Sequence, residues 1–276
     1  MVYPREIFVF LNSNEDEHRF RLVGQAVASL GYFFSINKYL VDKNKKYIPL
    51  IILCFIVIVM LGFRTMLIAS IFVTFILVVR IYGFSRKIIV PFLAMILILV
   101  VVVQIPFIQD VIARMFERQQ TDSFEDSDYI RILQLDYYMN NHFKNIWEFI
   151  FGSGIPYPSS DYGYYMYSFH QRDQYGYITG TSITGWFDWG LIGLSWVAGI
   201  PTVLAMIAYA IRAYFLKVFS QYYYIGCWFL YLLLVSPLTI EFFREGAFVF
   251  HGIALYIVEK AHLEYKRDSI LSRKNG

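Results

Sequence analysis

The sequence predicts an all-α polytopic membrane protein with about seven transmembrane helices and one large, partly helical extracytoplasmic loop. Three observations lead to this fold class. Of the 276 residues, 58% are hydrophobic and 16% are charged, whereas soluble domains have about 45–50% apolar and about 25% charged residues. The apolar residues gather in runs long enough to cross a bilayer. One long, more polar stretch separates two groups of these runs.

The composition also excludes several classes of protein. A soluble enzyme or a disordered chain does not fit this apolar content. The net charge of +3 is too small for a nucleic-acid-binding surface, so no nucleic acid is expected as a partner. Cys54 and Cys227 lie within apolar runs and form neither a disulfide framework nor a zinc-site spacing. Residues 1–21 lack the continuous apolar core of a signal peptide.

Seven stretches have the length and apolar content of a membrane span, for which about 20 mainly apolar residues are needed. They are 22–40, 47–63, 65–82, 88–108, 186–211, 222–240 and 246–259. The first is diluted by polar residues, namely Gln25, Ser29, Ser35 and Asn37. One helix over 48–82 would be about 52 Å long, well beyond a hydrocarbon core of about 30 Å. A break is therefore expected at Gly62-Phe63-Arg64.

Basic residues in the short loops set the orientation of the chain. Fourteen of the 24 basic residues fall on one side of the seven-span arrangement, which is therefore cytoplasmic. The C-terminus is then inside, and the lipid bilayer is an expected partner. The resulting segments are an extracytoplasmic N-terminal segment (1–21), transmembrane helices 1–4 (22–108), a large periplasmic loop with active-site elements (109–185), transmembrane helices 5–7 (186–259) and a basic cytoplasmic tail (260–276).

The basic residues on the outer side are almost all arginines, which bind phosphate through two parallel hydrogen bonds. Arg64 is bordered by apolar residues on both sides. It is expected either to face the bundle interior or a water-filled cavity, or to reach phospholipid headgroups. Arg131 lies in the first turn of a predicted helix, where a cation opposes the helix dipole. It therefore has either a functional role or an ion pair with Asp126 or Asp128.

The outer loop contains a predicted amphipathic helix from Tyr129 to Phe151, because its apolar residues recur mostly every three or four positions. Gly152-Ser153-Gly154 ends this helix. Several tyrosines follow, including Tyr164 and Tyr165, and they either contact sugar rings or form an aromatic belt at the membrane interface. His170 is either a general base or a solvated loop histidine.

Three short motifs follow one another in a distinctive order. Arg64-Thr65 opens a span after a tight turn, and Arg131 lies at the start of a helix that runs into Phe151-Gly152-Ser153-Gly154. Gly190-Leu191-Ile192-Gly193 then begins a span directly after the loop. Together, over residues 19–210, these motifs resemble the O-antigen ligase and O-antigen polymerase superfamily of bacterial envelope enzymes.

Three departures from the family pattern refine this resemblance. The family's ligases have a His-Asn pair at a register that falls here on Thr179-Gly180, which favours a polymerase over a ligase. Phe63 replaces the family's serine before the arginine. Members of the family also have about ten to twelve spans, so the seven seen here indicate the C-terminal portion of a longer enzyme.

The resemblance implies polymerisation of polyprenyl-diphosphate-linked oligosaccharide repeat units into O-antigen, capsule or exopolysaccharide. The reaction would be a metal-independent, inverting glycosyl transfer at the outer face of the bacterial cytoplasmic (inner) membrane, with no cofactor. The partners would be a lipid-linked glycan donor and a glycan acceptor.

The resemblance also assigns roles to individual residues. Arg64 and Arg131 would hold the diphosphate, and Arg19 and Arg21 are second candidates for the same site. His170 or Asp128 would deprotonate the acceptor hydroxyl. From their side-chain chemistry, Tyr164 and Tyr165 are the candidate sugar contacts, with the interfacial aromatic belt as the alternative.

Two other functions fit the same sequence features. A ligase would transfer finished glycan to a lipid or other acceptor. A non-enzymatic transporter or accessory subunit would serve polysaccharide export, but the sequence has no internal repeat of the kind that transporters show. Other polysaccharide assembly proteins are further candidate partners.

Overall fold

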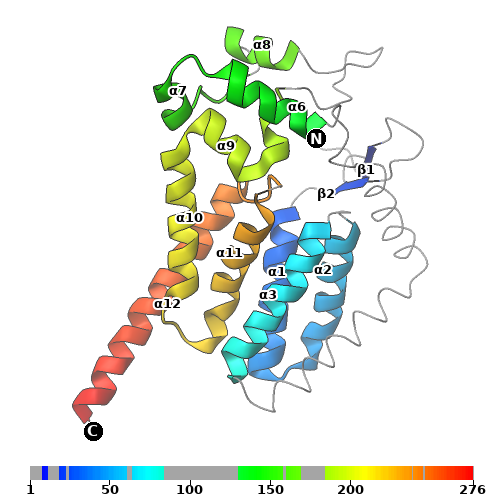
Figure 1. Ribbon diagram of the computed structural model, residues 1–276. Helices are drawn as coiled ribbons and strands as arrows, with labels where there is room; N and C mark the ends of the chain where they lie inside the picture. Colours follow the sequence, from blue (N-terminus) through cyan, green and yellow to red (C-terminus); the bar gives the residue numbers. More distant parts are fainter. Residues whose placement is uncertain are drawn as a thin grey trace. The chain divides into compact units, whose positions relative to one another are not determined.

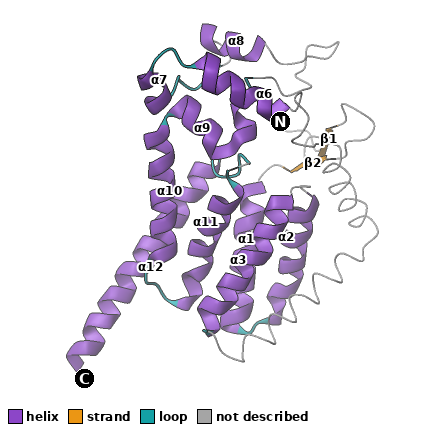
Figure 2. Ribbon diagram, in the orientation of Figure 1, coloured by secondary structure: helices purple, strands orange, loops and turns teal. Residues whose placement is uncertain are grey.

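The computed structural model describes residues 8–11, 19–22, 25–60, 64–83, 130–157, 160–168, 184–237, 239–244 and 246–275. These residues are almost entirely helical (Figures 1 and 2), which confirms the all-α class. The predicted span at 88–108, together with Asp128 and His170, lies outside the described residues. The chain divides into two compact units. The first comprises 1–116, 209–235 and 243–276, and the second comprises 117–208 and 236–242.

The first unit is a helical bundle with one small antiparallel sheet, in which β1 (Phe8–Leu11) pairs with β2 (Arg19–Leu22). Its helices are α1 (Gln25–Asp42), α2 (Ile48–Met60), α3 (Arg64–Tyr82), α11 (Tyr223–Val235) and α12 (Ala247–Asn275), with the short turns η2 (Lys45–Tyr47) and η6 (Ser220–Tyr222). α1 packs against α2, α3 and α11, and these helices lie side by side in Figure 1. The end of α10 (Ile200–Phe215) also belongs to this unit.

The helix ends agree with the break predicted from span length. α2 ends at Met60 and α3 begins at Arg64, so the apolar stretch over 48–82 forms two helices. Within the described residues, Thr65–Tyr82 is long and apolar enough to cross a bilayer, and Ile200–Phe215 is a shorter apolar helix. The all-α prediction therefore holds, and one of the seven predicted spans forms a helix of sufficient length and apolar composition.

Three of the polar residues that dilute α1 are turned into the bundle. Ser29, Ser35 and Asn37 are buried. The Ser29 hydroxyl accepts a hydrogen bond from Trp228 Nε1 at 3.0 Å, and Asn37 Nδ2 donates to the Gln221 carbonyl at 2.9 Å. The Ser29 hydroxyl and the Asn37 amide nitrogen thus have partners inside the unit, although both residues lie in an apolar stretch.

The second unit is built around stacked aromatic rings. Its elements are α6 (Ile130–Asp136), the π-helical turn η4 (Tyr137–His142), α7 (Ile146–Phe151), α8 (Asp161–Ser168), η5 (Trp186–Trp189), α9 (Gly190–Ala198) and the first half of α10. Tyr138, Met166 and Trp196 form its buried core. Tyr138 stacks on Trp196 with ring centroids 4.2 Å apart and an interplanar angle of 19°.

The prediction of one continuous helix from Tyr129 to Phe151 is wrong, because the helix is interrupted in its middle. The chain leaves the helix at Phe143, which is extended, and α7 starts again after Asn145. The Asn145 side chain accepts hydrogen bonds from the backbone N–H groups of Trp147 and Glu148, both at 3.0 Å. The Glu148 carboxylate in turn accepts from the Lys144 backbone N–H at 2.9 Å. This reciprocal cap competes with a continuous helix, and Asn-x-x-Glu is its sequence signal.

The predicted span at 186–211 is also interrupted. It consists of η5, α9 and the first turns of α10, with Gly199 between the two helices at a φ of +92°. Gly193 of α9 lies against the η5 backbone, because a Cβ there would be 1.6 Å from the Trp186 carbonyl oxygen. Only a residue without a side chain permits this approach.

Substituting Gly193 tests this packing. Gly193→Ala should lower the free energy of unfolding by about 3 kcal/mol, the upper end of the cost of overpacking, because a backbone carbonyl must move. The measurement is the midpoint of thermal unfolding of the purified protein. Gly252→Ala in α12 is the matched control, since a Cβ there meets nothing within 4 Å and alanine favours a helix by up to about 1 kcal/mol. Equal midpoints for the two variants would contradict the close approach.

Candidate functional site

The candidate site is a cluster of one imidazole and several hydroxyl groups in the second unit. His142 is the last residue of the turn η4, Ser153 lies in the turn after α7, and Tyr162 is in the first turn of α8. π-Helical turns occur frequently at functional sites. All three residues fall within the outer loop (109–185), where the sequence predicts active-site elements.

The three side chains form a closed triangle of hydrogen-bonding groups. His142 Nε2 is 2.7 Å from Ser153 Oγ, Ser153 Oγ is 2.9 Å from the Tyr162 hydroxyl, and that hydroxyl is 3.4 Å from His142 Nε2. His142 Nδ1 is 3.3 Å from the Tyr137 hydroxyl. A neutral imidazole has one donor and one acceptor nitrogen. If Nε2 accepts the Ser153 proton, Nδ1 therefore donates to Tyr137.

Ser153 is held in place by the end of α9. Its backbone N–H donates to the Trp196 carbonyl at 2.9 Å, and the Gly154 N–H donates to the Val197 carbonyl at 3.0 Å. These carbonyls belong to the last turn of α9, where a helix leaves carbonyls without an intrahelical partner. The Ser153 hydroxyl can also donate to Trp196 O at 3.2 Å, but the imidazole nitrogen is the nearer acceptor.

Gly152 permits this docking. It has a φ of +85°, and a Cβ there would be 2.5 Å from both the Gly199 nitrogen and the Val197 carbonyl oxygen. Gly199 is packed in the same way against the Phe151 carbonyl oxygen, at 2.5 Å from its own hypothetical Cβ. The glycine that the sequence places directly after Phe151 is therefore required because two backbones touch.

An aromatic frame surrounds His142. Its ring centroid lies 4.5 Å from that of Tyr138, and Tyr138 in turn stacks on Trp196. The Tyr138 hydroxyl donates to the Thr184 carbonyl at 2.9 Å, and the Thr184 hydroxyl donates to the Met166 carbonyl at 2.7 Å. Through Thr184, these bonds join α8 to the turn η4 and fix the position of the Tyr138 ring, which contacts His142.

Burial sets the protonation of the cluster. It lowers the pKa of His142 below its usual 6.5, while the Glu148 carboxylate acts in the opposite direction. Burial also raises the pKa of Tyr162, although the hydrogen bond with Ser153 partly offsets this. Near neutral pH the imidazole is therefore uncharged and the phenol keeps its proton. A neutral imidazole at hydrogen-bond distance from a hydroxyl has the geometry of a general base.

The residues predicted from sequence are distributed over both units. Arg131 is half-buried as the second residue of α6, at the opposite end of the helical segment from His142. Eleven positions separate them in the chain, and the last six residues of this segment form the π-helical turn η4, so the two side chains lie at opposite ends of it. Tyr164 and Tyr165 on α8 are 72% and 49% exposed. Tyr165 is also a hydrogen-bonding neighbour of Tyr137.

The other predicted residues belong to the first unit or lie outside the description. Arg64 is the first residue of α3. Arg19 and Arg21 are in β2, opposite Leu11 and Val9 of β1. Asp128 and His170 are outside the described residues, so both remain predictions. Within the described ranges, no three His, Cys, Asp or Glu side chains are placed to hold a metal ion.

Sequence reasoning missed His142, Ser153 and Tyr162. His142 lies inside the stretch interpreted as one amphipathic helix, and Ser153 was interpreted only as part of a helix stop. The helix-start signal at Asn145 could have revealed that His142 precedes a break. Nothing local indicates that Tyr162 returns to Ser153, because this contact depends on α8 folding back.

No protein-family model, curated protein or solved structure matches this chain. The site is therefore interpreted from its own geometry.

The lowered pKa of His142 makes stability depend on pH. Because the folded pKa lies below the unfolded value near 6.5, the unfolded chain binds the proton more tightly. The contribution to stability is complete above about pH 6.5 and is lost as pH falls through the folded pKa. Thermal unfolding from pH 7.5 to 5 should show a falling midpoint, and His142→Gln should remove part of that fall. An unchanged slope in the variant would contradict the buried neutral imidazole.

Proposed function

We propose that this chain polymerises polyprenyl-diphosphate-linked repeat units into a surface polysaccharide, by metal-independent, inverting glycosyl transfer at the outer face of the bacterial cytoplasmic membrane. One observation carries the proposal. The neutral imidazole of His142 lies 2.7 Å from the Ser153 hydroxyl oxygen, in the loop where the sequence predicts active-site elements. Transfer of a sugar to a hydroxyl needs such a base.

The polarity of the first unit supports a membrane location with several spans. Small polar side chains such as Ser35, Ser70 and Thr74 are buried between helices, whereas Leu53 and Ile68 are 58% and 66% exposed. Membrane bundles bury small polar residues at helix contacts, where they hydrogen-bond across or within helices. The exposed apolar side chains of the first unit would be in contact with the acyl chains of the lipid. The proposed arrangement is multi-pass, with the C-terminus in the cytoplasm.

In the proposed reaction, His142 takes the proton of the acceptor sugar's hydroxyl as that oxygen attacks the anomeric carbon of the donor. Ser153 Oγ marks where a hydroxyl oxygen can lie against Nε2. The bond from the anomeric carbon to the diphosphate oxygen breaks, and negative charge develops on the leaving group. Arg131 and Arg64 are the proposed partners of that charge, with Arg19 and Arg21 as second candidates.

Two further roles complete the proposal. The exposed rings of Tyr164 and Tyr165 offer apolar faces with a hydroxyl edge, which suit a sugar. His170 and Asp128 are alternative bases that the loop could supply. A ligase would use the same hydroxyl chemistry on another acceptor. A polymerase and a ligase are therefore distinguished by the glycan that each produces and not by the geometry of the site.

The glycan attached to the lipid carrier distinguishes the candidate functions. Cells that lack this protein, or carry His142→Gln, should accumulate single repeat units on the carrier, and the variant should lose about 10²–10⁴-fold in polymerisation rate, the usual contribution of a general base. The measurement is the size profile of lipid-linked glycans. His170→Gln tests the rival histidine in the same loop.

Each other result has a definite meaning. Long polymer left on the carrier would indicate a ligase. An unchanged profile in the deletion would contradict both enzymes and favour a transporter or accessory subunit. Inactivation by His170→Gln with normal polymer from His142→Gln would move the base to His170.

Arg131 provides an independent test. Arg131→Ala should abolish polymer while the protein stays in the membrane, and Arg131→Lys should lose most activity because lysine lacks the planar, two-pronged donor. Lys144→Ala is the matched control, because this exposed lysine is in the same loop and only its backbone N–H makes a described contact. Normal polymer from Arg131→Ala would refute the diphosphate role.

A further inference from the structure

α12 is longer than a membrane span needs. Its 29 residues extend over about 43 Å, close to the 40–45 Å of a bilayer including its headgroups. In Figure 1 its C-terminal turns extend away from α11 and the other helices of the same unit. The predicted boundary at residue 260 between span and tail thus falls within one continuous helix.

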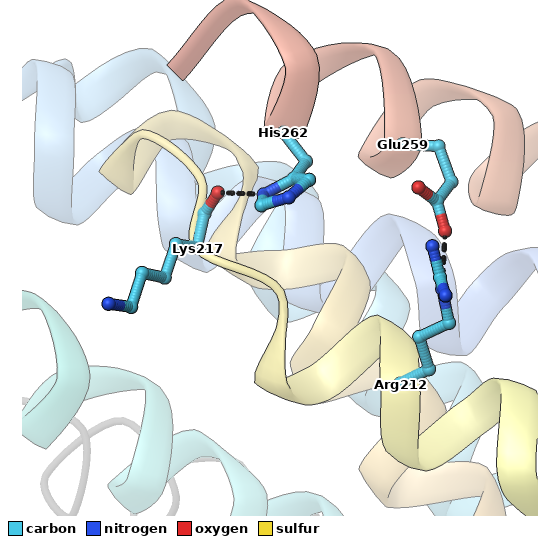
Figure 3. Close-up of polar contacts among 4 residues, drawn as sticks. All are labelled: Arg212, Lys217, Glu259 and His262. Atoms are coloured by element: carbon cyan, nitrogen blue, oxygen red, sulfur yellow. Dashed lines mark hydrogen bonds and ion pairs between the residues drawn. The ribbon is translucent and has the colours of Figure 1, made fainter. Parts of the chain in front are cut away.

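Contacts near the middle of α12 hold it against the end of α10 and the segment that follows it. Arg212 Nε donates to Glu259 Oε1 at 2.7 Å, and His262 Nδ1 donates to the Lys217 carbonyl at 2.8 Å (Figure 3). The rings of Phe219 and Tyr265 also meet, with centroids 5.3 Å apart. These contacts fix the rotation of α12 about its axis, and therefore which face it exposes.

One exposed face runs along the whole helix. In the first half it is apolar, with Val249, Ile253 and Tyr256 each more than 50% exposed. On a helical projection with 3.6 residues per turn, a set of exposed residues of the second half of α12 lies within an arc of about 160° that includes this apolar face. The exposed residues in that arc are Lys260, Leu263, Lys266, Arg267, Ile270, Leu271 and Arg273.

The acidic residues of the second half lie outside this arc. Glu264 projects about 20° beyond the edge of the arc and Asp268 about 60° beyond it. Arg267 approaches Asp268 only at 3.8 Å, and both side chains are exposed, so this pair contributes little. The apolar stripe of the first half lies within the same arc, toward one edge of it, and the second half widens the face and adds basic residues.

We propose that the second half of this face, from Lys260 to Arg273, binds the anionic headgroups of the cytoplasmic leaflet. This inference rests on the membrane location given under the proposed function. Continuity with an apolar stripe that suits acyl chains identifies lipid as the occupant. Leucine and isoleucine side chains enter the boundary between acyl chains and headgroups, and Lys and Arg reach the phosphates above it. Each such basic residue strengthens the attraction about fivefold.

Two neighbouring positions test the proposal in the full chain. Ile270 lies in the arc, and Ser272 projects from the opposite side. Nitroxide labels at Ile270→Cys or Ser272→Cys are introduced in a Cys54→Ser, Cys227→Ala background and studied in lipid nanodiscs. Changing from phosphatidylcholine to a mixture with phosphatidylglycerol should lower the exposure of label 270 to a water-soluble nickel chelate about fivefold or more. Label 272 should not respond.

Charge variants separate lipid binding from helix stability. Lys266→Glu with Arg267→Glu and Arg273→Glu should abolish the lipid response, since losing three basic residues weakens attraction by roughly a hundredfold. Lys266→Arg with Arg267→Lys and Arg273→Lys should retain it. Wild-type protein supplies a label-free measurement: tryptic cleavage after Lys266 and Arg267 should slow in the anionic discs alone.

The outcomes that would overturn the proposal are distinct. Equal nickel exposure of label 270 in both lipids, with equal tryptic cleavage, would overturn it. Spin–spin broadening at 270 in both lipids would assign the face to a second copy of the chain and would also overturn it. Protein that does not enter the discs would refute the membrane location and this inference together. Protein that responds to lipid but builds no glycan would contradict only the proposed function.

Discussion

Two backbone hydrogen bonds onto the last turn of α9 are the contacts on which the candidate site depends. They run from the N–H groups of Ser153 and Gly154 to the carbonyls of Trp196 and Val197. A helix end would otherwise leave these carbonyls to water or another donor. The same two bonds bring the Ser153 hydroxyl to His142. The carbonyls at the end of α9, which need hydrogen-bond donors, thus position the Ser153 side chain. Gly152 and Gly199 make this backbone contact sterically possible.

The bundle of the first unit obeys a different constraint, since several of its buried hydroxyl and indole groups have partners inside the unit while apolar side chains such as Leu53 and Ile68 are exposed. Trp228 donates to Ser29, and the Thr74 hydroxyl pairs with that of Tyr32 at 3.3 Å. Thr74 also donates to the Ser70 carbonyl at 2.6 Å. In a medium without water each such group needs an internal partner. This distribution of polarity gives the strongest physical basis for the proposed membrane location.

Hydropathy and length suffice for much of the fold, because they determine where helices can exist. The break between α2 and α3 follows from the thickness of a bilayer, and the helical content of the outer loop follows from apolar spacing. The interruption after His142 could not be predicted in this way, since the Asn145 cap competes locally with the helical period. The small sheet of β1 and β2 was also not foreseen.

The site was only partly accessible from sequence for a similar reason. The loop and its glycine-rich turn were identified, but the residue that matters in that turn, Ser153, acquires its role from α9, more than 40 positions later. Tyr162 returns from α8 to the same point. Such contacts depend on tertiary docking, which neither residue spacing nor composition encodes.

Thr184 has a consequence for how this protein can vary. Its hydroxyl bonds to the Met166 carbonyl and its own carbonyl accepts from Tyr138, so the chain on either side of residues 169–183 is tied together at one point. Position 184 therefore tolerates little variation. Valine, which has nearly the same shape but no hydroxyl, would lose the bond to α8, the helix that carries Tyr162, while its carbonyl could still hold Tyr138. A change of one atom far from His142 in the sequence would thus loosen one side of the imidazole cluster and leave the other in place.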